Sequence, residues 1–401
     1  MVEHFDPVAK VGVPAIVRED MLRKAARFVK RLKTSGLNAT VSWSGLLWLW
    51  RYLHRDHVIV LMIHGTMDGD TPSTWRPLRD RLSPKHLDKV LRVLAPRYRF
   101  VSLDEAVAIV ARKAPSRRAM VLTFDDGYRN NITHAIPVLQ RYRMPATIFL
   151  PTGNIDSQMP FWYDRVDYAL QHSKIQRLEY QLDSSTGVLK GKDRERLKRS
   201  FEELREKAKG MGCTEEEMIR RLEPLTEELE RRAQSKLSDK MGDDPWAGLL
   251  TWPEARAAQS SSVRFGSHTV DHVALGTASR LAVCEQLARS KETLERELGT
   301  ACGHVAYPYG SFSPLVAEVT RSCGYSAGVT TEEGTNPPGT DPIALRRLNV
   351  PVSGSETEIL ANLSGFYPAL WRMRDRLHLW LRPRAGVAAA RKTSAVRELP
   401  Q

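Results

Sequence analysis

Short apolar runs alternate with longer amphipathic stretches along most of the chain. The runs at 57–64, 120–124 and 146–150 are bounded by turn or capping residues, which is typical of buried strands. Between them, capping residues such as Ser83 and Ser102 mark the beginnings of helices. The alternation predicts an α/β fold with a sheet of parallel strands.

The same alternation returns in the last third of the chain. Residues 279–298 form an amphipathic pattern of helical period, and Gly299 is a suitable end for that helix. Further strands are expected at 263–266, 304–307, 325–330 and 345–350. We therefore expect strands from both regions to belong to the same α/β domain.

Between these regions, residues from about 155 to 248 break the pattern and are dense in charge. Apolar residues recur there with helical spacing, at Leu197, Phe201 and Leu204 and then at Met218, Leu222, Leu225 and Leu229. We predict a helical insertion whose charged positions are solvated faces. A role of these charges in gripping a substrate is the alternative.

Both ends of the chain are basic. We expect a basic helical extension at 1–55, a central domain at 56–365 that contains the insertion, and a basic tail at 366–401. Tryptophans within 41–50 follow a basic segment at 18–33, a combination that suits a helix at a membrane interface. The alternative is a helix packed on the central domain.

The composition suits a globular protein, with 42% hydrophobic and 27% charged residues among 401. The formal net charge of +13 is compatible with acidic glycans, an anionic membrane surface or nucleic acid, and does not choose among them. The basic residues lie mainly in the termini and the insertion, and no nucleic-acid module is recognisable, so nucleic acid is not expected as a partner.

The four cysteines, Cys213, Cys284, Cys302 and Cys323, form no Cys-x-x-Cys pair and suggest free thiols in a reducing compartment. The first residues lack the pattern of a secretory signal, and no apolar run approaches the roughly 20 residues of a membrane span. We therefore expect a location in the cytoplasm or at the periphery of the inner membrane surface.

Two adjacent carboxylates, Asp125 and Asp126, follow the apolar run at 120–124. Adjacent negative charges at the end of a buried strand repel each other and are poorly solvated. Their presence is explained if Asp126 binds a cation and Asp125 acts as a base. The alternative is a turn, since Asp-Asp-Gly is favourable turn chemistry.

Two imidazoles four residues apart, His268 and His272, follow another predicted strand. One aspartate with two histidines is a common ligand set for a catalytic zinc-like ion with open coordination positions. We therefore assign Asp126, His268 and His272 as candidate metal ligands. Surface or capping histidines are the alternative reading of this spacing.

His64 and Tyr309 also follow predicted strands. In α/β barrels the chemistry lies at the carboxyl ends of the strands, so these residues are expected near the aspartates and histidines. His64 is a candidate general acid, and the alternative is a buried core histidine. Tyr309, in a turn at 306–310, is a candidate to present its backbone N–H to a developing oxyanion, and the alternative is an aromatic turn.

Together these motifs resemble those of the polysaccharide deacetylase family, the NodB-type carbohydrate esterases. Residues 123–127 resemble the family's first motif, 267–272 its second, which contains His-x-x-x-His, and 306–310 its third. The resemblance covers about 57–155 and 250–352. It implies a distorted (β/α) barrel of about seven strands and a divalent metal ion, usually zinc.

Two positions depart from the family pattern. The third motif usually begins with arginine, where this chain has Ala306, and the usual late acid histidine has no counterpart at 345–350. Both departures resemble a branch that deacetylates poly-N-acetylglucosamine, in which the acid histidine ends the first strand, as His64 does here. Arg346 or Arg347 would then supply the positive charge near the base.

The resemblance implies metal-dependent hydrolysis of N-acetyl groups on the amino sugars of a polysaccharide or its precursor. An O-acetyl ester or a cyclic amide could be the bond cleaved by the same residues. A non-catalytic glycan-binding protein on this scaffold is the alternative from another class. The sequence names neither the glycan nor whether the substrate is a polymer or a lipid-linked precursor.

Overall fold

The computed structural model describes residues 45–381, except 113, 115, 116, 183, 184, 192, 212 and 214. The chain divides into two compact units, Gly45–Phe366 and the terminal segments Met1–Ser44 with Tyr367–Gln401. The basic segment predicted at 18–33 and most of the predicted basic tail, 382–401, lie outside the described residues. The part of the second unit that is described belongs to the helix α15 (Phe366–Leu381).

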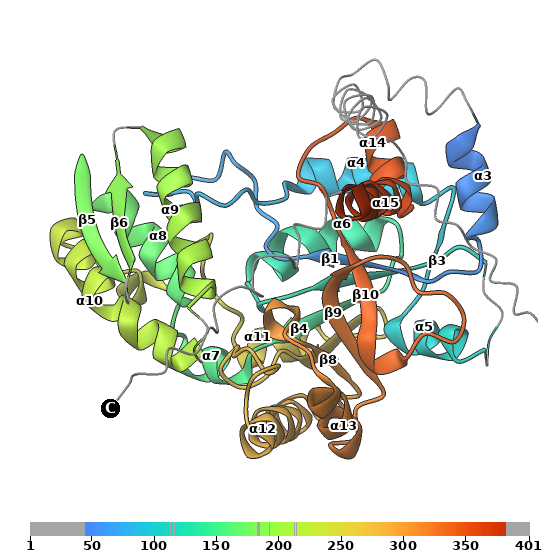
Figure 1. Cartoon of the computed structure of the whole chain (residues 1–401). Helices are drawn as coiled ribbons and strands as arrows, with labels where there is room; N and C mark the ends of the chain where they lie inside the picture. The colour runs from blue at the N-terminus through green and yellow to red at the C-terminus, as the bar shows by residue number, and fades with distance from the viewer. Residues whose placement is uncertain are drawn as a thin grey trace, which may run out of the picture. The chain divides into compact units, whose positions relative to one another are not determined.

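Seven parallel strands close into a barrel in the larger unit (Figure 1). They are β1 (Ile59–Ile63), β3 (Ala119–Phe124), β4 (Ala146–Leu150), β7 (Val263–Ser267), β8 (His304–Ala306), β9 (Ala327–Glu333) and β10 (Leu345–Asn349). The order is β1-β10-β9-β8-β7-β4-β3, and pairing of β3 with β1 closes the ring, while the short β2 (Arg99–Phe100) pairs outside it with β3. The prediction of a distorted (β/α) barrel of about seven strands is confirmed.

The register of the strands brings their carboxyl ends to one rim. Ile63 in β1 pairs with Phe124 in β3, and Phe124 pairs with Ile148 in β4. Farther round, Leu150 at the end of β4 pairs with Ser267 at the end of β7. Polar residues that directly follow these strands are therefore neighbours, although the sequence separates them widely.

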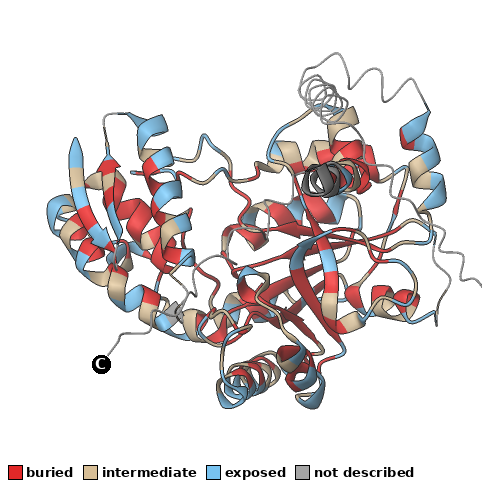
Figure 2. Cartoon of the chain, in the orientation of Figure 1, coloured by how far each residue is buried: buried red, intermediate tan, exposed pale blue. Residues whose placement is uncertain are grey.

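The barrel strands are apolar and lie in the interior of the unit, where Figure 2 shows them as mainly buried. Every residue of β1, β3 and β4 is buried, because helices cover the outside of the barrel and side chains fill its inside. The outer elements are α4 (Pro84–Leu94), α5 (Leu103–Val110), η1 (Asn131–Ala135), α6 (Ile136–Arg141), α11 (Trp252–Ala258), α12 (Arg280–Leu298), α13 (Pro314–Ser322) and α14 (Glu356–Leu363).

The insertion forms a group of its own beside the barrel (Figure 1). It contains α7 (Thr152–Ser157), α8 (Trp162–His172), α9 (Arg194–Lys209), α10 (Glu215–Ala233) and the short η2 (Ser238–Lys240). It also contains an antiparallel hairpin of β5 (Arg177–Leu182) and β6 (Ser185–Lys190) that the sequence did not predict. The sequence does not indicate the hairpin clearly because its two strands are mostly polar and bury few residues, at alternate positions.

Three further short elements belong to the larger unit: α3 (Leu46–Leu53), η3 (Pro308–Gly310) and η4 (Pro342–Ala344).

Among the helices of the described residues, none combines the length and the apolar character needed to cross a bilayer. The predicted inward positions of the insertion are buried, including Phe201 and Leu204 of α9 and Leu222 and Leu229 of α10, except Leu197, which is half-buried. The helical part of the insertion therefore packs through the faces that the sequence indicated.

Candidate metal centre

Three candidate metal ligands meet at the carboxyl rim of the barrel. Asp126 lies just after β3, and His268 and His272 lie just after β7. The His268 Nε2 atom is 3.6 Å from Asp126 Oδ1, and the His272 Nε2 atom is 3.4 Å from the same oxygen. All three residues are buried, and their ligand atoms lie within 4.8 Å of one another. Within the described part of the chain, this is the one group of three or more such residues able to hold a metal ion.

The hydrogen bonds of these side chains suit metal ligation. Nδ1 of His268 lies 2.7 Å from the carbonyl oxygen of Ala306, and because a carbonyl only accepts, this nitrogen carries the proton. Nε2 is then left to face Asp126, the tautomer that a metal ligand needs. The hydroxyl of Tyr163 donates to Asp126 Oδ2 at 3.1 Å, which leaves Oδ1 directed at the imidazoles.

Burial and mutual contacts set the charges of the group. Burial alone would raise the pKa of Asp126, but contacts with His268 and His272 hold that pKa well below its usual value. Burial lowers the pKa of His272, which favours the neutral imidazole. The ligand set is therefore an ionised carboxylate with nitrogen donors, which fits a divalent ion of borderline softness such as zinc.

Strained backbone conformations cluster at the same place. Asp126, Thr269, His272 and Tyr309 have φ angles of 72°, 67°, 56° and 56°, in the left-handed region that non-glycine residues rarely adopt. Thr269 is β-branched, which makes its conformation the most costly of these. The surrounding fold must hold these residues in place, as is common at functional sites.

The second carboxylate of the pair, Asp125, has a different environment. It is buried and accepts two hydrogen bonds from Arg347 of β10, from Nη1 to Oδ1 at 2.8 Å and from Nη2 to Oδ2 at 2.7 Å. Burial alone would raise the pKa of Asp125, but the charge of Arg347 lowers it below the usual value. Asp125 is therefore an ionised carboxylate outside the group of three possible ligands.

The sequence left Arg346 and Arg347 as alternatives for the positive charge near Asp125. In the structure Arg347 is buried and contacts Asp125, whereas Arg346 points outward and pairs with Glu332 at 2.9 Å. The alternation of side chains along β10 explains the difference, because neighbouring residues of a strand face opposite sides. The guanidinium thus comes from β10, while Ala306 contributes only its carbonyl oxygen to His268.

His64 lies beside Asp125. It directly follows β1, and the pairing of Ile63 with Phe124 puts the two residues after them side by side, with the Asp125 N–H donating to Ile63 at 2.9 Å. His64 is partly exposed. Burial lowers the pKa of His64. This effect outweighs the negative charges of Asp126 and Asp125, which would raise that pKa. Its role as general acid remains a prediction.

Tyr309 lies beside the candidate metal ligands. Its ring contacts that of His272 edge to face, with 4.9 Å between the ring centroids, and its hydroxyl accepts from Trp162 Nε1 at 3.3 Å. The residue is 36% exposed. The structure thus brings Tyr309 to the centre, and the role of its amide in binding an oxyanion remains a prediction.

A buried polar network behind the metal ligands was missed by the sequence analysis. Asp164 accepts from the hydroxyl of Tyr128 at 2.5 Å and pairs with Arg79 and Arg81 at 3.2 and 3.5 Å. Asp164 follows Tyr163, the residue that binds Asp126. These residues begin α8, in a segment interpreted as solvated insertion. The signal available was the aromatic run before Asp164, which is unusual for a solvated helix.

Comparison with known proteins agrees with the site motifs. The sequence model of the family described as polysaccharide deacetylase matches residues 112–207 and 213–328, more than half of the chain. The chain belongs to the polysaccharide deacetylase family. The matched residues include Asp125, Asp126, His268, His272 and Tyr309, and His64 and Arg347 lie outside them.

One curated relative of this polysaccharide deacetylase is a putative polysaccharide deacetylase of Bacillus subtilis, YxkH. It is 33% identical over 69 residues, which are 17% of this chain and 25% of the relative, so the match spans a quarter of that protein's length. Among solved structures, Streptococcus pyogenes deacetylase PplD in complex with acetate has 18% identity and a TM-score of 0.49, with 77% of this chain and 98% of that chain covered. IcaB from Ammonifex degensii has 20% identity and a TM-score of 0.48, with 78% and 97% covered.

Proposed function

We propose that the chain is a metal-dependent hydrolase that removes N-acetyl groups from the amino sugars of a polysaccharide or of its precursor. The observation that carries the proposal is that two adjacent carboxylates at the rim have different partners, which suits them to different roles. Asp126 faces two imidazoles, and Asp125 is held by Arg347 beside them. A site with three metal ligands and a separate ionised carboxylate has the parts that metal-assisted hydrolysis needs.

Asp126, His268 and His272 are the residues that would hold the ion. A divalent ion there, most suitably zinc, would act as a Lewis acid toward an acetyl carbonyl and make water a stronger acid. Tyr163 orients Asp126 through its hydroxyl, and Ala306 orients His268 through its carbonyl oxygen. These outer contacts fix the directions of the ligand atoms before any ion binds.

Asp125 is the proposed general base. It would take a proton from the attacking water, and its two hydrogen bonds from Arg347 hold the carboxylate in one orientation. The backbone N–H of Tyr309 is the proposed donor to the oxyanion of the tetrahedral intermediate. These groups lie on different strands of the rim, so the substrate carbonyl would be bound between them.

His64 is the proposed general acid, which would protonate the departing amine. Its position after β1, next to Asp125, suits a group on the leaving-group side of the scissile bond. A lowered pKa makes the imidazolium a stronger acid, at the cost of a smaller protonated fraction near neutral pH. Acetate and a free amino sugar would be the products.

Acetate release tests this proposal. Full-length protein loaded with zinc is incubated with a chitin oligosaccharide. In a separate reaction the substrate is the corresponding oligosaccharide with free amino groups and acetylated hydroxyl groups. The acetate released is measured in both. Release from the N-acetylated substrate that is lost in Asp125→Asn supports N-deacetylation. Release from the O-acetylated sugar alone would favour the esterase, and metal uptake without release from either substrate would favour a glycan-binding protein.

A membrane surface is the proposed site of action, and α3 is the element that supports this. Its exposed apolar side chains are Leu46, Trp48, Leu49, Tyr52 and Leu53. Only part of the helix packs inward: Leu47 is buried, and Trp50 Nε1 donates to the Ser364 carbonyl at 2.9 Å. An exposed row of Trp, Leu and Tyr on one helix is typical of an interfacial contact.

Cations lie beside this apolar row. Arg55, Arg117 and Arg118 line a pocket together with Tyr52, and the Arg55 guanidinium stands 4.4 Å from the centroid of the Tyr52 ring. Cations next to interfacial aromatic residues attract anionic lipid headgroups. The partner that we propose for α3 is therefore an anionic bilayer.

Vesicle sedimentation tests the membrane contact. We expect the protein to bind vesicles that contain phosphatidylglycerol and to bind pure phosphatidylcholine vesicles weakly. The double substitution Trp48→Ala, Leu53→Ala should reduce binding, whereas Leu281→Ala, which removes an exposed leucine of α12, should not. Equal binding of the three proteins would mean that α3 does not face the bilayer.

A further inference from the structure

Four cations lie on one side of the candidate metal centre, and only two carboxylates, Asp164 and Glu206, pair with them in the described part of the chain. Arg79 and Arg81 lie in the loop that follows β1, and Arg205 and Lys209 lie in α9 of the insertion. None of these four residues was assigned a role by the sequence motifs. Arg79 is the member of this group that lies next to Tyr163, which contacts the candidate ligand Asp126.

Arg79 is one aromatic ring away from Asp126. Its guanidinium carbon stands 4.1 Å from the centroid of the Tyr163 ring, and the Tyr163 hydroxyl donates to Asp126 at 3.1 Å. The Arg79 side chain is 20% exposed, so it is reachable from outside. A group bound by Arg79 would therefore lie near the acetyl group that Asp126 and its partners process.

Arg79 and Arg81 share a single carboxylate. Both guanidinium groups approach the same oxygen of Asp164, Oδ1, at 3.2 and 3.5 Å, while the other oxygen accepts from Tyr128. Two positive charges thus face one negative charge. The pair retains a net positive charge in a region where burial makes unbalanced charge costly.

The helix α9 adds two further cations to the same side. Arg194 donates to the carbonyl oxygen of Pro77 at 2.7 Å, and Lys198 pairs with Asp80 at 2.8 Å, so this face of α9 lies along the loop that carries Arg79. Arg205 and Lys209 are seven and eleven positions after Lys198. With 3.6 residues per turn, both therefore belong to that same face.

The guanidinium groups have donors left over. The Nε atoms of Arg79, Arg81 and Arg205 are buried and have no hydrogen-bond partner in the described part of the chain. The pKa of Arg205 is lowered by burial and next by repulsion from Arg79, and that of Lys209 by burial and next by repulsion from Arg205. The Lys209 side chain is 40% exposed and pairs with Glu206 at 3.6 Å, whereas the three arginines keep unused donors. Cations that repel one another and keep unused donors are suited to an incoming anion.

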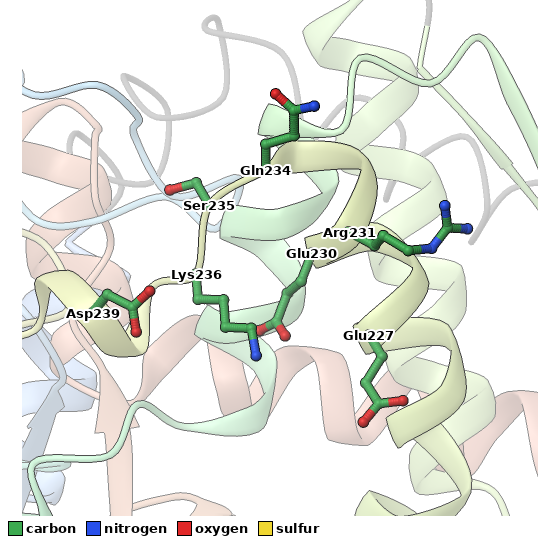
Figure 3. A pocket seen from close by; sticks show the side chains of 7 residues that line it. All are labelled: Glu227, Glu230, Arg231, Gln234, Ser235, Lys236 and Asp239. Carbon is green, nitrogen blue, oxygen red and sulfur yellow. The ribbon is translucent and has the colours of Figure 1, made fainter.

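Another arginine of the insertion, Arg165, is better matched by carboxylates. Arg165 of α8 donates four hydrogen bonds to Glu223 and Glu230, at 2.6 to 2.9 Å. Glu230 also lines a polar pocket of about 510 Å³ at the end of α10, whose other side chains carry both signs of charge (Figure 3). In that pocket the acidic side chains outnumber the basic ones, whereas Arg79 and Arg81 share one carboxylate.

We propose that Arg79, Arg205 and Lys209 form a subsite for an oxyanion carried by the glycan substrate close to the acetamide that is cleaved. The proposal rests on the proposed function, because it names the class of substrate for the same site. The shared chemistry is a phosphate or carboxylate oxygen bound by guanidinium and ammonium donors. The two sources are the sugar phosphate of a lipid-linked precursor and a uronic acid residue of an acidic polymer.

Isothermal titration calorimetry with full-length, zinc-loaded protein tests the subsite. The probes are N-acetylglucosamine 1-phosphate against N-acetylglucosamine, and a hyaluronan tetrasaccharide against chitotetraose. We expect at least one anionic probe to bind about tenfold tighter than its neutral counterpart, since charge-assisted hydrogen bonds are the stronger class. Preference for the phosphate points to the precursor, and preference for the hyaluronan fragment points to an acidic polymer.

Two double variants of α9 test whether the preference for the anionic probe depends on the proposed donors. Arg205→Gln with Lys209→Gln should abolish the preference for the anionic probe, because it removes the proposed donors. Arg196→Gln with Arg199→Gln removes the same charge from exposed positions of the same helix and should preserve the preference. Equal affinity for charged and neutral probes, or an equal loss in both double variants, would overturn the subsite.

Acetate release from neutral chitotetraose separates this proposal from the proposed function. The Arg196→Gln, Arg199→Gln variant should cleave the neutral substrate at the wild-type rate, because these exposed residues lie outside the proposed subsite and the candidate catalytic groups. If wild-type protein binds the anionic probes selectively but releases no acetate from any substrate, the deacetylase assignment fails while the anion subsite stands.

Discussion

The guanidinium of Arg347 donates two hydrogen bonds to the carboxylate of Asp125, although 222 positions separate the two residues in the sequence. Both side chains are buried, and Arg347 also donates to the Thr330 carbonyl and to the Thr123 hydroxyl. The guanidinium therefore has its own position fixed by β3 and β9. Through this pairing β10 sets the orientation and the charge of the proposed base.

Substitution of Arg347 should reduce turnover without removing the metal. Arg347→Lys keeps a positive charge but loses the paired geometry, and we expect kcat to fall at least about tenfold. Arg347→Met leaves a buried carboxylate without its partner and should also lower the free energy of unfolding by about 3–5 kcal/mol. Acetate release, bound zinc and thermal unfolding would be measured for each variant.

Arg346→Gln is the matched control for these variants. Arg346 is the adjacent residue of β10 but points outward to Glu332, so its loss should change kcat by less than about twofold, as for an exposed ion pair. An Arg347→Lys enzyme with unchanged kcat would show that Asp125 does not depend on the pairing.

The two adjacent aspartates should separate metal binding from turnover. Asp125→Asn preserves the ligand group and should retain zinc while losing most of kcat, by about 10²–10⁴-fold for a lost general base. Asp126→Asn removes the central carboxylate between His268 and His272 and should lose zinc as well as activity. Elemental analysis after dialysis measures the first property, and acetate release measures the second.

The opposite pattern would reverse the assignment of the two carboxylates. If Asp125→Asn lost zinc and Asp126→Asn retained it, Asp125 would be the ligand. His268→Ala serves as a reference for metal loss, since His268 is the proposed ligand whose tautomer the Ala306 carbonyl fixes.

Much of this site could be predicted from the sequence because each residue follows an apolar run. Asp125, His268 and His64 lie directly after strands, Asp126 lies one residue further on, and parallel strands deliver such residues to one rim. The barrel followed from the same alternation of strand and helix. The prediction was strongest where local pattern and topology point to the same place.

Contacts from side chains inside the barrel were not predictable in the same way. β10 buries Arg347 and exposes Arg346, and a buried arginine is too rare to expect in advance, so Arg346 and Arg347 stayed equivalent. Tyr163 and Asp164 were hidden because the charged insertion around them suggests a solvated helix. Only the packing of the start of α8 against the rim reveals their contacts.

His64 should matter for turnover and leave the metal in place. His64→Ala is expected to lower kcat by about 10²–10⁴-fold, because a positioned acid no longer protonates the leaving amine. His134→Ala is a suitable control, since His134 is a histidine of η1 to which no role is assigned. An unaltered kcat in His64→Ala protein that binds zinc normally would make His64 a structural histidine.

Tyr163 should act as a positioning residue for the metal ligand. Tyr163→Phe removes the hydroxyl that donates to Asp126 at 3.1 Å and leaves the ring that Arg79 covers. We expect zinc affinity to fall by about 10–100-fold, the usual effect of losing an outer contact of a ligand. Competition with a fluorescent zinc chelator measures the affinity directly and needs no substrate.

Tyr168→Phe provides the comparison on the same helix. Tyr168 is buried in α8 and its hydroxyl contacts Ser235 at 2.8 Å, away from the metal ligands. Its loss should affect stability and not zinc affinity. Equal zinc affinities for the wild type and Tyr163→Phe would mean that the Tyr163 hydroxyl does not position Asp126 for metal binding.

Asp167 should make the stability of the fold depend on pH. Its carboxyl group is fully buried and accepts from the Leu78 N–H at 2.8 Å and from Gln171 at 2.7 Å. Burial raises its pKa from 3.8 to about 7. A raised pKa in the folded state favours the protonated form, so the contribution to stability is complete below about pH 4 and is lost as the pH rises through about 7.

Asp167→Asn tests this dependence because the amide is neutral at every pH and keeps an acceptor for the Leu78 N–H. Relative to the wild type, we expect the variant to gain stability as the pH rises from 5 to 8, by up to about 3 kcal/mol, since about two pH units lie between 5 and the folded-state pKa of about 7 and each corresponds to about 1.4 kcal/mol. Urea unfolding at several pH values measures the difference. A constant difference between the two proteins across this range would mean that Asp167 is ionised in the folded state throughout, with its charge balanced by the neighbouring Arg79.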